Sequence, residues 1–242
     1  MTRTLLAITI LGALAGPAAA VTHVVRNTDT DGEGSLREAV SNAEKGDTIL
    51  FGTGVRGTIA LDEMLEIENL NIKGPGADAV TIRGNGDVTL QLAGTSAVSG
   101  LTIAGGNTAL EIDNGRATLL DTVVADSRGN GIVIEEGRLT LLRSQVSGNA
   151  GAGVEATGGT VYCVNSTIAD NGGAGLRADG GTIETRSCSI AYNRGAGLEA
   201  AGGEVIAHNT LLAGNLRGCD GSITSKGYNP VSYTHLTLPT KA

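Results

Sequence analysis

The sequence is poor in aromatic residues: they make up 2% of its 242 residues, and tryptophan is absent. Ordinary globular cores use aromatic rings freely, because each ring buries a large area. Proline is also scarce, with four residues, whereas glycine is abundant, with 38. A chain that must pack Gly, Ala, Val, Ile and Leu in place of rings is expected to have a thin and regular core.

Positive charge is scarce as well, with 17 Lys and Arg against 25 Asp and Glu, for a formal net charge of −8. The chain contains no run of Lys or Arg. Nucleic acids and anionic membrane surfaces attract such runs, so we expect neither as a partner. After the first twenty residues no apolar segment is long enough to cross a bilayer, so we expect no membrane span in the mature chain.

Residues 1–20 have the three parts of a secretory signal. A positively charged start is followed by the apolar stretch 5–15 and by three alanines that match a small-residue cleavage site. We expect cleavage after Ala20, which leaves Val21 as the mature start of a protein that is secreted or held at the cell surface. An uncleaved anchor helix is the alternative, and the short apolar stretch disfavours it.

A repeat of 22 residues begins at about residue 109 and continues without slippage. One aliphatic column contains Ile132, Val154, Leu176 and Leu198, and one amide column contains Asn149, Asn171, Asn193 and Asn215. Within each repeat, apolar residues alternate in short pairs separated by glycine turns, which indicates three short strands. Stacked coils let each strand pair with its equivalent about 4.8 Å away. The repeat therefore predicts a parallel β-solenoid of triangular section, with the amide column as a ladder at one bend.

The three cysteines are an odd number for an exported chain, so at least one is free or paired outside it. Cys163 and Cys188 occupy positions where other repeats have Leu, Ser or Thr. We interpret them as small buried residues rather than as a disulfide framework. Cys219 lies beyond the regular repeats.

The stretch GSLREAV at residues 34–40 places a hydroxyl, a guanidinium and a carboxylate close together, as a catalytic group would. Ser35 and Glu38, however, have the spacing of a helix capping box, and apolar residues follow at helical spacing. We therefore predict a short capping helix at about residues 35–45. It would cover the first coil, where an open end exposes the core and unpaired strand groups.

The 22-residue coil and the Asn ladder, over residues 100–217, resemble the right-handed parallel β-helix superfamily, whose best-known members are pectate lyases. Residues 21–51 resemble the opening module of bacterial surface β-helix proteins with a Cys-Ser-Leu-Arg-Glu-Ala signature, although Gly34 stands in the cysteine position. Residues 218–229 resemble the closing segment of the same proteins. The resemblance implies an all-β fold, a single right-handed parallel β-helix.

The predicted domain organisation follows from these boundaries. We expect a signal peptide at 1–20, a cap at 21–51, irregular early coils at 52–108, regular coils at 109–217, a closing segment at 218–230 and a non-native tail at 231–242. The tail breaks the repeat and resembles translated sequencing-adapter read-through. We therefore expect the native reading frame to continue beyond about Pro230 with a different sequence.

One outward column of the predicted solenoid alternates in charge, with Glu155, Arg177 and Glu199 one coil apart. As a structural feature this is a surface charge ladder. As a functional feature it supplies candidate catalytic residues on a saccharide-binding face. Pectate lyases are similar in using a strongly basic residue, with acidic residues that hold Ca²⁺.

The candidate binding residues are Tyr162, Tyr192, Glu135 and Asp179. The two carboxylates belong to an acidic set interrupted by Thr157, which lacks the dense cluster that Ca²⁺ prefers. His23 and His208 are isolated in the sequence and offer no metal geometry. We therefore expect no metal or cofactor, with Ca²⁺ entering only under a lyase function.

Uniform repeats, few aromatic residues and no clear acid–base cluster favour a non-catalytic surface protein. We expect an adhesin-like or glycan-binding rod whose partner is extracellular or cell-wall polysaccharide. The alternative, which rests on the fold resemblance, is a polysaccharide lyase or glycoside hydrolase acting on acidic polysaccharides. The chain could also be the N-terminal part of a larger surface protein, which is compatible with both.

Overall fold

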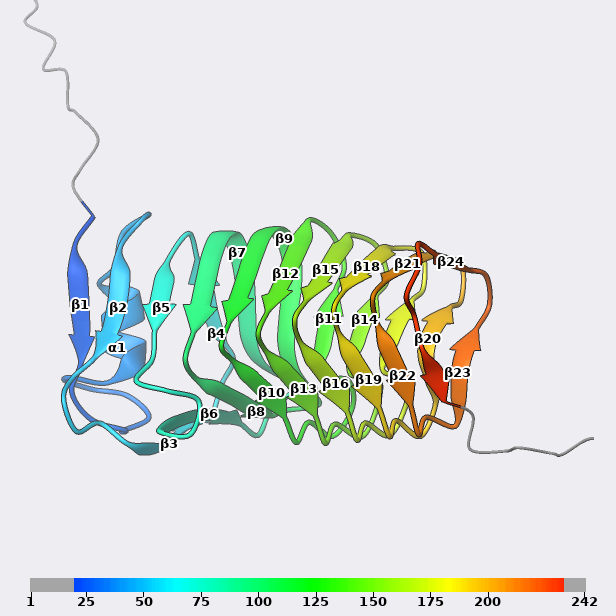
Figure 1. Cartoon of the computed structure of the whole chain (residues 1–242). Helices are drawn as coiled ribbons and strands as arrows, with labels where there is room; N and C mark the ends of the chain where they lie inside the picture. The colour runs from blue at the N-terminus through cyan, green and yellow to red at the C-terminus, as the bar shows by residue number, and fades with distance from the viewer. Residues whose placement is uncertain (1–19, 233–242) are drawn as a thin grey trace, which may run out of the picture.

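The computed structural model describes residues 20–232, which form a rod of stacked coils (Figure 1). Each coil contributes strands to three faces, and every strand pairs in parallel with its equivalent in the next coil. The predicted all-β parallel solenoid with about 22 residues per coil is confirmed. The predicted signal peptide lies outside the described residues except for Ala20, as does the predicted tail except for Val231 and Ser232.

Face A is a sheet of nine strands. It contains β3 (Gly57–Leu61), β6 (Val80–Gly84), β8 (Thr102–Gly105), β10 (Val123–Ala125), β13 (Gln145–Ser147), β16 (Thr167–Ala169), β19 (Ser189–Ala191), β22 (Leu211–Ala213) and β25 (Val231–Ser232). Because β25 pairs with β22, the first two residues of the predicted tail continue this face.

Faces B and C meet without a break in the long strands β7 (Val88–Ser99) and β9 (Thr108–Leu120), whose first parts belong to face B and second parts to face C. Face B also contains β4 (Leu65–Glu68), β11 (Ile132–Ile134), β14 (Val154–Ala156), β17 (Leu176–Ala178), β20 (Ala196–Ala200) and β23 (Arg217–Asp220). Face C also contains β1 (Thr22–Val25), β2 (Thr48–Phe51), β5 (Asn71–Lys73), β12 (Arg138–Leu142), β15 (Thr160–Val164), β18 (Thr182–Arg186), β21 (Glu204–His208) and β24 (Ile223–Ser225).

The core is a set of aliphatic stacks that run along the rod. The predicted inward column of Ile132, Val154, Leu176 and Leu198 is fully buried and pairs in register from coil to coil. Such stacking buries the inward side of each short strand, which no coil could do alone. Cys163 and Cys188 are also buried, as expected, and their Sγ atoms lie 2.8 Å apart, whereas Cys219 is exposed.

The corner between faces A and B contains the predicted amide ladder. The Nδ2 of each asparagine donates to the Oδ1 of the asparagine one coil further on, at 3.0 Å, 2.9 Å and 2.8 Å along the series Asn149, Asn171, Asn193 and Asn215. Each Nδ2 also donates to a backbone carbonyl of face A. The buried amides are therefore satisfied within the protein, as burial of polar groups requires.

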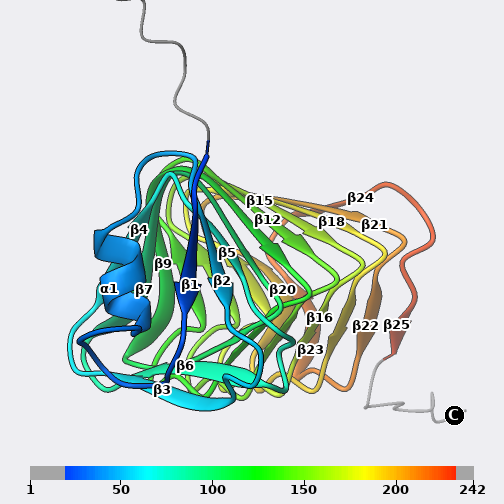
Figure 2. The ribbon, with the colours of Figure 1, turned by 90° about the vertical axis from the view of Figure 1, so that its left-hand side faces the viewer.

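The N-terminal helix α1 spans Leu36–Ser41, with Ser35 as its N-cap. The Ser35 Oγ accepts a hydrogen bond from the Glu38 N–H at 3.1 Å, and the Glu38 carboxylate accepts one from the Gly34 N–H at 2.6 Å. Figure 2 shows α1 beside the N-terminal edge of face B. In the first coil the helix comes before β2, just as β4 comes before β5 in the next coil. Leu36 belongs to the buried core.

The predicted end of this helix, near residue 45, is wrong. The helix ends at Ser41, and the N–H of Asn42 bonds to the carbonyl of Glu38 while the N–H of Ala43 bonds to the carbonyl of Val40. Gly46 then adopts a φ of +94° and donates its N–H to the carbonyl of Asn69 in the next coil, at 2.8 Å. The contact with the neighbouring coil turns the chain toward β2 earlier than the local sequence indicates.

Candidate functional site

The predicted catalytic residues meet on face B. Glu155, Arg177 and Glu199 are register neighbours on β14, β17 and β20. Arg177 Nη1 donates to Glu199 Oε1 at 2.8 Å, and Nε lies 3.1 Å from Glu155 Oε1. The predicted binding residue Asp179 joins them, because its Oδ2 lies 3.4 Å from Arg177 Nη2. The structure thus brings these four predicted residues into one cluster.

The charges of the cluster are paired within the protein, although the buried Nε–H of Arg177 has no hydrogen-bond acceptor among the described residues. The guanidinium of Arg177 is shared by three carboxylates, and the second carboxylate oxygen of Glu155 accepts from Asn130 Nδ2. A substrate carboxylate would have to displace one of the protein's own carboxylates, with which Arg forms strong charge-assisted bonds. This geometry is that of a mutually neutralised charge ladder on a half-exposed surface.

The other predicted binding residues lie apart from that cluster and from each other. Glu135 follows β11 and is two coils from Asp179. Tyr162 points outward from β15 on face C. Tyr192 lies at the corner after β19, with a φ of 56° and 67% of its surface exposed. The four predicted binding residues therefore do not form one site.

Face C carries a group that the sequence reasoning missed. The guanidinium carbon of Arg138 lies 5.1 Å from the centroid of the Tyr162 ring, a cation–π contact. Arg116 is the register neighbour of Arg138 in the preceding coil, and both side chains are exposed. Within residues 20–232, neither guanidinium forms an ion pair. Thr118 and Thr140 point outward from the same two strands. The 22-residue spacing of the two arginines was the available signal.

A second polar group continues along face C, one coil beyond Tyr162. Glu184 is the register neighbour of Tyr162, and its Oε1 accepts from Arg186 Nε at 2.8 Å and Nη2 at 2.6 Å. His208 Nε2 lies 3.6 Å from the same oxygen. His208, isolated in the sequence analysis, is therefore part of a polar cluster. Glu184 is already bonded by Arg186, so this group resembles the paired charges of face B.

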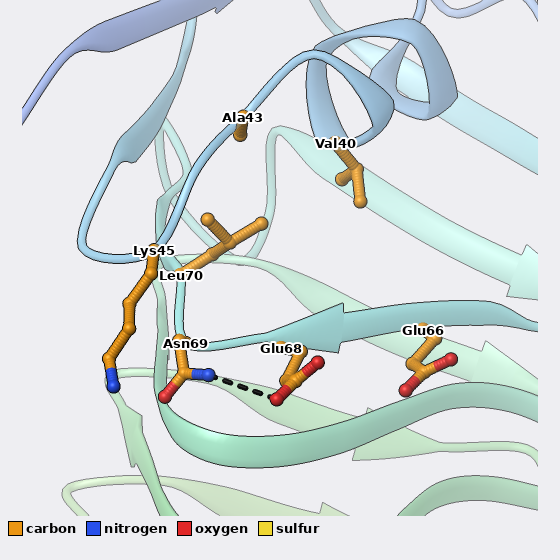
Figure 3. Close-up of a pocket in the computed structure, with 7 residues that line it drawn as sticks. All are labelled: Val40, Ala43, Lys45, Glu66, Glu68, Asn69 and Leu70. Atoms are coloured by element: carbon orange, nitrogen blue, oxygen red, sulfur yellow. Dashed lines mark hydrogen bonds between the residues drawn. The ribbon is translucent and has the colours of Figure 1, made fainter.

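A cleft of about 510 Å³ lies between the end of α1 and β4. Its lining residues, all labelled in Figure 3, are Val40, Ala43, Lys45, Glu66, Glu68, Asn69 and Leu70. Glu66 and Glu68 present two carboxylates on one side of β4, and Asn69 Nδ2 donates to Glu68 Oε1 at 3.1 Å. Lys45 lies beyond Asn69 in the same view, away from both carboxylates (Figure 3).

The described chain holds no group of three or more His, Cys, Asp or Glu side chains arranged to bind a metal ion. Over the same residues, no helix has the length and apolar character needed to cross a membrane.

Comparison with known proteins identifies the family to which the chain belongs. A family model described as "Right handed beta helix region" matches residues 90–229, and the chain belongs to this family. Among solved structures, pectate lyase Pel9A is similar with a TM-score of 0.69 at 12% identity, over 86% of this chain and 68% of that one. Geobacillus virus E2 ORF18 covers 86% of this chain and 59% of its own at 13% identity, with a TM-score of 0.41. No curated protein matches the chain. At such identities the likeness concerns the fold alone.

Proposed function

We propose that this protein is an exported, non-catalytic rod that binds acidic extracellular or cell-wall polysaccharide through face C. The observation that carries the proposal is the exposed pair Arg116 and Arg138 beside Tyr162. Guanidinium groups bind carboxylates in a planar, two-point geometry, and uronic acids present one carboxylate per sugar. The two arginines belong to adjacent coils, about 4.8 Å apart along the rod.

The neighbouring side chains suit the same ligand. Thr118 and Thr140 offer hydroxyl donors and acceptors, and the edge of the Tyr162 ring offers apolar surface. The protein as a whole is acidic, at −8, so an anionic chain is attracted to this local patch rather than to the rod in general. The proposal therefore limits the contact to a few coils of face C.

The absence of catalysis is supported by the arrangement around Arg177. Three carboxylates lie within 3.4 Å of its guanidinium, so a uronate carboxylate would meet negative charge there. A polysaccharide lyase or glycoside hydrolase is the competing function, and its support is the fold shared with pectate lyase Pel9A.

Calorimetric titration with polygalacturonate and with alginate tests the binding function. We expect Arg138→Ala to weaken binding about tenfold or more, since a charge-assisted hydrogen bond contributes about 1.5–3 kcal/mol. The matched control is Arg143→Ala, because Arg143 is engaged by Asp121 at a corner of the rod and is expected to leave binding unchanged. Equal losses in both variants, or no binding to either polymer, would contradict the proposal.

Incubation of the protein with the same polymers and Ca²⁺ tests the competing function. We expect no unsaturated uronate product by ultraviolet absorbance. Product that forms with the wild-type protein and disappears with Arg177→Ala would establish the lyase function instead.

A further inference from the structure

The first coil contains a buried carboxylate, Asp47, whose hydrogen-bond partners include the backbone nitrogen at the expected mature N-terminus. Asp47 precedes β2 and is 4% exposed. Its Oδ1 accepts a hydrogen bond from the backbone N–H of Val21 at 2.6 Å. Its Oδ2 accepts from the Glu44 N–H at 2.9 Å and lies 2.9 Å from His23 Nε2. Hydrogen bonds from Glu44, Val21 and His23 lower the pKa of Asp47 to about 2, so the carboxylate is charged at neutral pH.

This carboxylate lacks a permanent cation. Within residues 20–232 its one ion-pair partner is His23, which is charged only when protonated. A buried carboxylate is ordinarily paired with a full positive charge or with several donors, and Asp47 has the second arrangement, with two backbone N–H groups and His23. The atom closest to Asp47 among its donors is the backbone nitrogen of Val21.

Val21 is held in place from both sides. Its carbonyl accepts a hydrogen bond from the Thr48 N–H at 2.9 Å, while its nitrogen contacts Asp47. The pairing of β1 with β2 begins at the next residue, Thr22. Val21 is 54% exposed, so this residue lies at the edge of the folded rod. The nitrogen that contacts Asp47 is the one that the expected cleavage after Ala20 would release.

We propose that hydrolysis of the Ala20–Val21 peptide bond creates an α-ammonium group on Val21 that pairs with the buried Asp47 and fastens β1 onto β2. Water adds across the amide bond, Ala20 leaves with the carboxylate, and the Val21 nitrogen takes up a proton at neutral pH. The neutral hydrogen bond thereby becomes a charge-assisted one, which is shorter and stronger. The inference rests on the export included in the proposed function and is independent of what the rod binds.

The ion pair gives a defined dependence on pH. A carboxylate partner raises the pKa of an α-amino group above its ordinary range of about 7.7–8.0. Its contribution to stability is therefore complete below that range and is lost as the pH rises through the raised value. The titratable groups on the packed elements are His23 on β1, Asp47 before β2, and Glu44 and Lys45 in the loop from α1.

Four proteins test the proposal: one starting at Val21, one with two extra alanines before Val21, and the Asp47→Asn version of each. At pH 6 we expect the protein that starts at Val21 to melt about 2–4 °C higher than the extended one. We expect this difference in melting temperature to disappear at about pH 10 and to be absent between the two Asp47→Asn proteins. Both proteins of a pair carry an α-amino group and the same other charged groups, so the difference in melting temperature reports whether that α-amino group lies on Val21.

Amino-terminal sequencing of the exported protein completes the test, with Val21 expected as the first residue. A different first residue overturns the proposal, and so does an equal melting difference with Asp47→Asn. If the Asp47→Asn proteins fail to fold, the other two proteins still test the proposal. Their difference in melting temperature must be present at pH 6 and absent at about pH 10. Failure of polysaccharide binding would leave all these outcomes unchanged, so the two proposals fail separately.

Discussion

Leu176 illustrates how strictly a single position is constrained in this rod. Its side chain is fully buried between Val154 and Leu198 of the adjacent coils. An unpaired carboxylate at this position would cost several kcal/mol, because nothing in an aliphatic stack can bond to it. Such a loss is comparable to the whole free energy of unfolding of an ordinary domain, so the variant is not expected to remain folded.

We therefore expect Leu176→Asp to abolish soluble, cooperatively melting protein, as measured by size-exclusion chromatography and thermal circular dichroism. The matched control is Val164→Asp, an apolar residue that points outward on β15 and is half-exposed. We expect this control to fold. A Leu176→Asp protein that melts like the control would show that the inward assignment is wrong.

Which residues point inward was predictable, because alternation along a strand fixes the side of each side chain. The partners of outward residues were not, since they depend on the bends between strands. Arg143 and Ser187 occupy one corner column with φ values of 49° and 55°, a left-handed conformation that their residue types do not signal. Within face C, Arg138 lies over Tyr162 and His208 lies near Glu184 as diagonal neighbours on adjacent strands. The repeat places these residues one coil apart, but the side-chain conformations that bring them together cannot be read from it.

At the scale of elements, α1 depends on its cap. The helix has six residues, too few to be stable by itself, so its ends and its buried Leu36 hold it in place. The capping spacing and the apolar face were readable from the sequence. The end was not, because Gly46 bonds to Asn69, a residue of the next coil that local spacing does not reveal.

We expect Ser35→Ala to lower the free energy of unfolding by about 1 kcal/mol, since it removes the acceptor for the Glu38 N–H. Urea denaturation measures the change. Ser41→Ala, at the exposed end of the same helix, serves as the control and should cost less. Polysaccharide binding on face C is expected to be unchanged in both, and a loss of binding at unchanged stability would give GSLREAV a functional role after all.

At the scale of the whole molecule, the rod is a one-dimensional stack in which each coil contacts chiefly its neighbours. The pairing registers repeat at a step of 22 residues, as from Val133 to Glu155 and from Glu155 to Arg177. Stability in such a stack is close to a sum of coil and interface contributions. The fold was predictable at this scale because a fixed repeat has few other ways to bury its inward columns.

Deletion of residues 132–153, one complete repeat, tests this additivity. We expect a soluble protein with an unchanged β-sheet spectrum and a somewhat lower melting temperature, because Gly131 and Gly153 occupy equivalent positions. Deletion of residues 143–153 shifts the faces out of register and is expected to prevent folding. Similar behaviour of the two deletions, by circular dichroism and size-exclusion chromatography, would contradict the coil as the structural unit.

The amide ladder also gives the rod an electrical direction. Asn149, Asn171 and Asn193 each donate one side-chain N–H to the asparagine of the next coil, and Asn215 accepts the last of these bonds. The parallel strands run across the rod, so their own dipoles have little component along it, whereas these side-chain dipoles all point along the rod. Hydrogen bonds in such a file polarise one another, so each added coil strengthens the series. A β-helix with an Asn ladder thereby acquires along one corner a small counterpart of the helix macrodipole, with its positive pole toward the last coil.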